Sequence, residues 1–237
     1  MIHYTDPIDP TRRIPFYERE EIERITWDEL RATGQATEDP GPVCIETFLM
    51  ERYGIGLDYV DFPEDICGEA VFSSRGIDAI RIRREFAPPT SRGLYLLGRS
   101  TSGHETGHAI LHASEIVPEM ASGGDAGRLF RHRSRGGDIG PEGSGFSRTS
   151  FSRHRALEWQ ANAAMGGLLM PRPAVMSALG TDTREGVPGA IRRDGFVLWS
   201  ELLAETFDVS GQLAGYRLLD IFPTLRDLAG RDDALAA

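Results

Sequence analysis

Apolar residues in the first part of the chain recur at helical spacing on otherwise polar segments. From residue 15 to 33, an acidic run is interrupted by Ile22, Ile25, Trp27 and Leu30. This spacing predicts a surface helix with one apolar stripe. A second helical pattern covers residues 43–52, and the glycine after Tyr53 is a typical helix end.

The periodicity then changes from helical to alternating. Between residues 57 and 84 the clearest alternation is Ile80-Arg81-Ile82-Arg83, which predicts a short, half-exposed strand in a small sheet. Helical spacing returns from residue 94 to 114 and from 156 to 170, where Pro171 and Pro173 should stop the helix. A polar stretch to residue 194 leads to two more predicted helices, at 196–207 and 211–221.

The stretch 121–155 differs from its surroundings. It contains eight glycines and seven arginines but few large apolar residues. This composition predicts a flexible insertion. The insertion could be a docking site for an acidic partner or a self-cleaved lid, or simply a solvated linker. We expect residues 1–41 to form an N-terminal accessory arm, 42–222 the main domain, and 223–237 a C-terminal tail.

Composition narrows the class of protein. The 237 residues carry a formal net charge of -10, and all 26 basic residues are arginines. An acidic surface repels the phosphate backbone, so direct nucleic-acid binding is not expected. Residues 1–10 resemble neither a signal peptide nor an anchor, and no apolar run approaches the roughly 20 residues that span a bilayer. We therefore expect a cytoplasmic protein without membrane contact, in which Cys44 and Cys67 are small buried side chains.

The strongest chemical signal is the sequence His104-Glu105-Thr106-Gly107-His108. Residues four apart on a helix project from one face, separated by about 6 Å along the axis, so both imidazoles can bind one ion. Glu105 can then reach a water bound to that ion and take its proton. This is the HExxH pattern of zinc peptidases.

A catalytic zinc normally has three protein ligands and one open position. The metzincin pattern would need glycine and histidine where Leu111 and Ser114 stand, so that subclass is excluded. His112 lies about 12 Å along the axis from His104, too far to share its ion. We expect His112 to pack in the interior or to support a residue that binds the metal.

Glu158 is the best carboxylate candidate for the third ligand, because it lies near the start of the next apolar helix. The alternative is that it only favours the helix dipole. Ala161 is small enough to let this helix pack against Gly107. Asn162 lies on the same face as Glu158 and could accept a hydrogen bond from the outer nitrogen of a ligand histidine.

Other signals are weaker. His132 and His154 lie in the insertion and are expected to be solvated. Residues 201–218 have the cadence of a helix-turn-helix, but their acidic surface favours packing on the core over DNA contact. The group that stabilises the oxyanion stays open among four candidates, which are Tyr95, Tyr216, Arg99 and His154.

These motifs together resemble the ImmA/IrrE family of metallo-endopeptidases over roughly residues 42–220. The resemblance is carried by Ile45-Glu46 through Tyr53-Gly54-Ile55, HETGHAILH at 104–112, EWQANAAMGGLLMP at 158–171 and LAETFDVS at 203–210. The insertion is longer than is usual in the family, and alanines stand at 163 and 164 where an aromatic residue is common.

The resemblance implies a compact, zincin-like α+β domain with a small mixed sheet and a helical C-terminal part. It also implies a gluzincin-like site in which His104, His108 and Glu158 bind zinc and Glu105 is the base. The implied substrate is a protein regulator, such as a transcriptional repressor. The alternative is a zinc-stabilised regulatory or DNA-binding protein that cleaves nothing.

Overall fold

A small mixed sheet forms one side of the molecule. The computed structural model describes residues 2–5, 13–121, 131–133, 153–180 and 186–229. The sheet has the order β3-β5-β4-β6, formed by β3 (Leu57–Val60), β4 (Ile66–Ser73), β5 (Gly76–Arg83) and β6 (Arg131–Arg133). β3 runs parallel to β5, whereas β4 is antiparallel to both β5 and β6. The expected α+β class with a small mixed sheet is confirmed.

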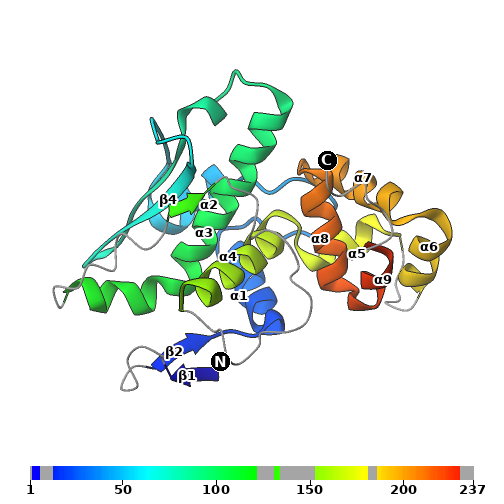
Figure 1. Ribbon diagram of the computed structural model, residues 1–237, viewed down its shortest axis with the longest axis horizontal. Coiled ribbons are helices and arrows are strands. Elements are labelled where there is room, and N and C mark those ends of the chain that lie inside the picture. Colours follow the sequence, from blue (N-terminus) through cyan, green and yellow to red (C-terminus); the bar gives the residue numbers. More distant parts are fainter. Residues whose placement is uncertain (1, 6–12, 122–130, 134–152, 181–185, 230–237) are drawn as a thin grey trace.

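Two helices cross beside the sheet and carry the candidate site. Helix α3 (Arg92–Ala121) packs against β4 and β5 on one side and against α4 (Arg153–Leu169) on another (Figure 1). Both helices begin earlier than the apolar spacing predicts, and α3 also ends later, with Pro118 inside its last turns. The α3–α4 pair is the most extensive helix contact among the described elements.

The N-terminal segments pack on this pair. α1 (Arg19–Ala32) lies against α4 and buries Ile22, Thr26 and Leu30. The hairpin of β1 (Ile2–Thr5) and β2 (Arg13–Phe16) precedes it. α2 (Ile45–Tyr53) ends at Gly54, whose φ of 69° is left-handed, which confirms the predicted glycine stop.

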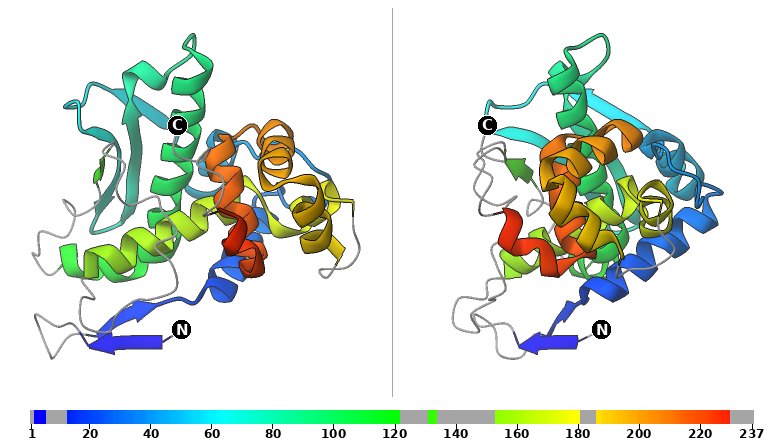
Figure 2. Two further views of the ribbon diagram at one scale, coloured as in Figure 1. Left: turned by 45° about the vertical axis from the view of Figure 1, so that its right-hand side comes forward. Right: turned by 90° about the vertical axis from the view of Figure 1, so that its right-hand side faces the viewer.

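The C-terminal helices gather on the side of α3 away from the sheet (Figure 2). They are α5 (Arg172–Ala178), α6 (Gly186–Asp194), α7 (Phe196–Phe207), α8 (Gly211–Ile221) and α9 (Arg226–Ala229), with the one-turn 3-10 helix η3 (Pro223–Leu225) between α8 and α9. A second 3-10 helix, η1 (Arg84–Phe86), follows β5. The sequence predicts α7 and α8 at their observed bounds. α7 and α8 contribute buried Leu203, Phe207 and Leu218 to the core cluster that also contains Phe48 and Ile80.

The polar stretch before residue 194 contains two helices that the sequence pattern did not predict, α5 and α6. Proline is compatible with the first turn of a helix, as Pro173 is in α5. One expectation is wrong. Cys44 is exposed at the N-terminal cap of α2, while Cys67 is buried as expected. In the described part of the chain, none of the helices is long and apolar enough to cross a membrane.

Candidate metal centre

Helix α3 places His104 and His108 side by side in the interior. Each side chain is 1% exposed, and their Nε2 atoms lie 3.1 Å apart. Two imidazole nitrogens that both present lone pairs repel each other at this distance, so a proton or a cation must lie between them. The short distance between the two rings confirms that His104 and His108 project from one face of α3, as predicted.

Helix α4 brings Glu158 to the same point. Its Oε2 lies 3.2 Å from Nε2 of His104, and its Oε1 lies 3.4 Å from Nε2 of His108. Taking one ligand atom from each residue, all three atoms fall within 4.8 Å of one another. The group that sequence reasoning assembled from two helices could therefore hold a metal ion.

The spacing suits a small tetrahedral cation. Ligand atoms about 2.1 Å from a tetrahedral zinc are about 3.4 Å from each other. The nitrogen–nitrogen and nitrogen–oxygen separations at the His104, His108 and Glu158 group lie between 3.1 and 3.4 Å. Two neutral imidazoles and one carboxylate are also a donor set that zinc accepts in catalytic sites. The residues present fit the ion.

Charge is distributed as such a site requires. Burial works to raise the pKa of Glu158, but hydrogen bonds from His104 and His108 outweigh it, and the pKa lies far below its ordinary value. Burial lowers the pKa of His104, but the hydrogen bond and charge of Glu158 outweigh burial, and the pKa lies above its ordinary value. The carboxylate is thus ionised and attracts positive charge to the place where the three residues meet.

The outer nitrogens of both histidines have partners. His104 Nδ1 lies 2.9 Å from Oδ1 of Asn162, an oxygen that only accepts, so Nδ1 donates, and Nε2 is the nitrogen that the neutral ring could offer to a metal. His108 Nδ1 lies 2.9 Å from Nδ1 of His112. The predicted contact of Asn162 with the outer nitrogen of a histidine in the motif is confirmed, and His112 contacts His108 without belonging to the three-residue group.

Glu105 faces the sheet from the same turn of α3. It is 0% exposed, and neither carboxylate oxygen has a hydrogen bond of normal geometry among the described residues. Burial raises the pKa of Glu105 to about 8, against the opposing attraction of His104 and the Ala70 backbone N–H. A carboxyl group whose pKa lies close to neutral pH can both accept a proton and release it again.

Two glycines allow the close packing that this arrangement needs. A Cβ at Gly107 would lie 2.8 Å from the carbonyl oxygen of Ala161 and 3.0 Å from Cβ of Ala164. A Cβ at Gly68 of β4 would lie 2.6 Å from Cγ2 of Thr101. Real side chains do not tolerate such contacts, so glycine lets α4 and β4 approach α3 on both sides of the histidines. The predicted packing of Ala161 on Gly107 is confirmed.

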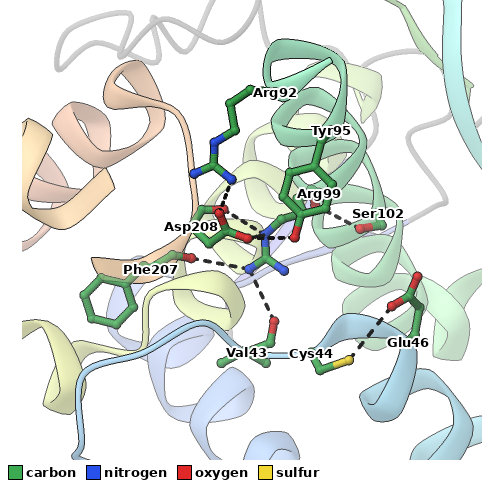
Figure 3. Close-up of polar contacts among 9 residues, drawn as sticks. All are labelled: Val43, Cys44, Glu46, Arg92, Tyr95, Arg99, Ser102, Phe207 and Asp208. Atoms are coloured by element: carbon green, nitrogen blue, oxygen red, sulfur yellow. Dashed lines mark hydrogen bonds and ion pairs between the residues drawn. The ribbon is translucent and has the colours of Figure 1, made fainter. Parts of the chain in front are cut away.

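An ion-pair cluster near the start of α3 was not predicted. Asp208, between α7 and α8, receives hydrogen bonds from the Arg92 guanidinium and from the Tyr95 hydroxyl, the latter at 2.7 Å (Figure 3). Arg99 Nε donates to the Asp208 carbonyl at 2.8 Å, and its Nη2 donates to the Phe207 carbonyl at 3.4 Å. Asp208 has a φ of 57°, which aspartate tolerates better than most residues.

This cluster bears on the oxyanion candidates. Tyr95 and Arg99 are both engaged with Asp208. Tyr216 accepts a hydrogen bond from Gln212 at 3.3 Å. The side chain of His154 lies outside the described residues, as do the side chain of His132 and most of the insertion. The partners of Asp208 lie more than 100 positions away in the chain, so local sequence patterns carried no signal for the cluster.

Comparison with known proteins adds no relative. No protein-family model matches the chain, and no curated protein and no solved structure matches it either. The functional argument therefore depends on the geometry of the residues themselves.

Proposed function

We propose that the chain is a zinc-dependent endopeptidase with a zincin-like domain, similar to the ImmA/IrrE enzymes, acting in the cytoplasm on a protein regulator such as a repressor. The observation that carries the proposal is the meeting of His104, His108 and Glu158 beside the fully buried Glu105. A site that served only to stabilise a fold would gain nothing from that side chain, because burying an acid costs free energy.

Each residue has a part in the proposed reaction. A bound zinc would polarise the scissile carbonyl and acidify a water molecule. His104 and His108 would bind the ion through their Nε2 atoms, and Glu158 would supply the single negative charge among the ligands. Glu105, with its raised pKa, takes a proton from the attacking water and passes it to the leaving amine. Asn162 keeps His104 in the tautomer that can bind metal.

The test compares the wild-type protein with Glu105→Gln, both loaded with zinc, on a peptide library made from a digested proteome. We expect about one zinc per chain in both proteins and a cleavage rate on the order of 10²- to 10⁴-fold lower in the variant, the usual contribution of a general base. Equal rates would exclude Glu105 as the base. A zinc-loaded wild-type protein that cuts no peptide would favour the non-cleaving regulatory alternative, for which His108→Ala but not Glu105→Gln should destroy function.

A further inference from the structure

A pocket adjoins the candidate metal centre on the side of the C-terminal helices. Its volume is about 220 Å³, and His104 and Asn162 form part of its lining. The start of α3 contributes Leu96 and Leu97, α4 contributes Met165, and α8 contributes Leu213. The pocket is therefore continuous with His104, and most of the surface that it exposes is apolar, although five of its lining side chains are polar.

The chemistry of the lining selects what can enter. The remaining lining groups are serine, glutamine and glycine residues, and none of the described residues that line the pocket is an acid or an arginine. A charged side chain would lose hydration there without gaining an ion pair with an acid or an arginine, which is costly. The volume suits a residue side chain, since a cavity of about 150 Å³ is known to hold a benzene-sized group.

The walls of the pocket are fixed relative to each other. Arg92, Tyr95 and Arg99 on α3 bind Asp208 and the backbone beside it, directly before the first turn of α8 (Figure 3). Ser210 then caps α8 by accepting a hydrogen bond from the Leu213 N–H at 3.1 Å. Because both walls are tied together, the pocket is formed before any ligand arrives, which favours selective binding.

We propose that this pocket binds one apolar side chain of the substrate, of the size of leucine, methionine or phenylalanine, in a residue next to the bond that is cut. The inference rests on the proposed peptidase function, because it is the metal ligand His104 that places the pocket beside the reacting bond. Burying such a side chain contributes about 1.5–3 kcal/mol, which is on the order of 10- to 100-fold in affinity.

Gly93 offers a way to fill the pocket without disturbing the metal ligands. It is exposed, lines the pocket from the first turn of α3, and a Cβ there would meet no atom within 4 Å. Gly189 in α6 is equally exposed and open but does not line the pocket. Gly93→Phe and Gly189→Phe are thus a matched pair of test and control variants.

The experiment measures binding of small hydroxamates to the zinc-loaded protein by calorimetry, so it needs no turnover. We expect 4-methylpentanohydroxamate and 3-phenylpropanohydroxamate to bind the wild type on the order of 10- to 100-fold more tightly than acetohydroxamate. Succinic monohydroxamate should show no such gain. In Gly93→Phe the apolar gain should disappear while acetohydroxamate binds as before, and Gly189→Phe should behave like the wild type.

Equal affinity of the wild type for all four hydroxamates would overturn the inference, as would a full apolar preference retained in Gly93→Phe. If that variant does not fold, Gln212→Trp blocks the same pocket from α8 and should give the same loss. An apolar preference in a protein that cuts no peptide would refute the peptidase function and leave the pocket as a binding site. Peptide cleavage without the preference would refute the pocket alone.

Discussion

The contact between Gly107 and Ala161 gives the sharpest mutational prediction. In Gly107→Ala, the new Cβ would lie 2.8 Å from the Ala161 carbonyl oxygen, whereas ordinary contact begins at 3.4 Å. Helices α3 and α4 must therefore separate locally by about 0.6 Å. Gly107 lies between the two histidines in α3, and Ala161 is one turn from Glu158, so the displacement acts directly on the three ligands.

Metal affinity is the sensitive readout of that displacement. Ligand distances in a metal site tolerate about 0.2 Å, so a shift of about 0.6 Å should weaken zinc binding on the order of 10- to 100-fold, as the loss of a ligand's support does. Overpacking should also cost about 1–3 kcal/mol of stability. Zinc affinity is measured by competition with a chromogenic chelator, and stability by chemical unfolding.

A glycine on the partner helix provides the control. A Cβ at Gly166 of α4 would meet Cδ of Arg217 at 3.6 Å, an ordinary contact. Gly166→Ala should therefore bind zinc like the wild type. If Gly107→Ala also binds zinc with wild-type affinity and stability, the close approach of the two helices does not position the ligands, and the reasoning fails.

Three further predictions concern support, charge and metal. Asn162→Leu removes the acceptor for His104 Nδ1 and should weaken zinc binding about 10- to 100-fold. Asn162→Asp keeps an acceptor, so its zinc affinity should fall less. A chelator titration that shows wild-type zinc affinity in Asn162→Leu would contradict this role. Arg217 is buried and paired with Glu23, so Glu23→Leu should cost about 3–5 kcal/mol at neutral pH, and Glu20→Leu, at an exposed site, much less. Burial works to raise the pKa of Glu23, but Arg217 outweighs burial and lowers that pKa. The stabilisation is therefore complete above the ordinary carboxyl pKa and is lost as pH falls through the lowered value. If the difference in unfolding free energy between the wild type and Glu23→Leu stayed constant in acid, the ion pair would not be its cause. Finally, removing zinc with a chelator should lower the stability by about 4 kcal/mol where the free zinc had been 1,000-fold above its dissociation constant, and unchanged thermal unfolding would mean that no ion is bound.

Local patterns predicted the elements of the site well. The HETGH spacing predicted the face of α3, and the small residue Ala161 predicted contact with Gly107, because helical geometry fixes which residues face each other once two helices pack. The same reasoning placed Asn162 on the face of Glu158.

What sequence could not predict depends on distant partners or on proline. Pro171 and Pro173 were interpreted as ending a helix, and they do so, but α5 starts at once because proline fits a first turn. Arg217 lies in a segment predicted only as a helix, yet it is buried against Glu23, 194 positions away. Asp208 likewise binds α3 side chains that are more than 100 positions away in the chain. Such pairings follow from tertiary packing and leave no periodic signal.

Diffraction from crystals of the zinc-loaded protein, measured on both sides of the zinc absorption edge, tests the metal centre most directly. We predict one anomalous peak between α3 and α4, within about 2.0–2.2 Å of Nε2 of His104, Nε2 of His108 and a carboxylate oxygen of Glu158. A peak elsewhere, or no peak at a zinc content of one per chain, would contradict the proposed site.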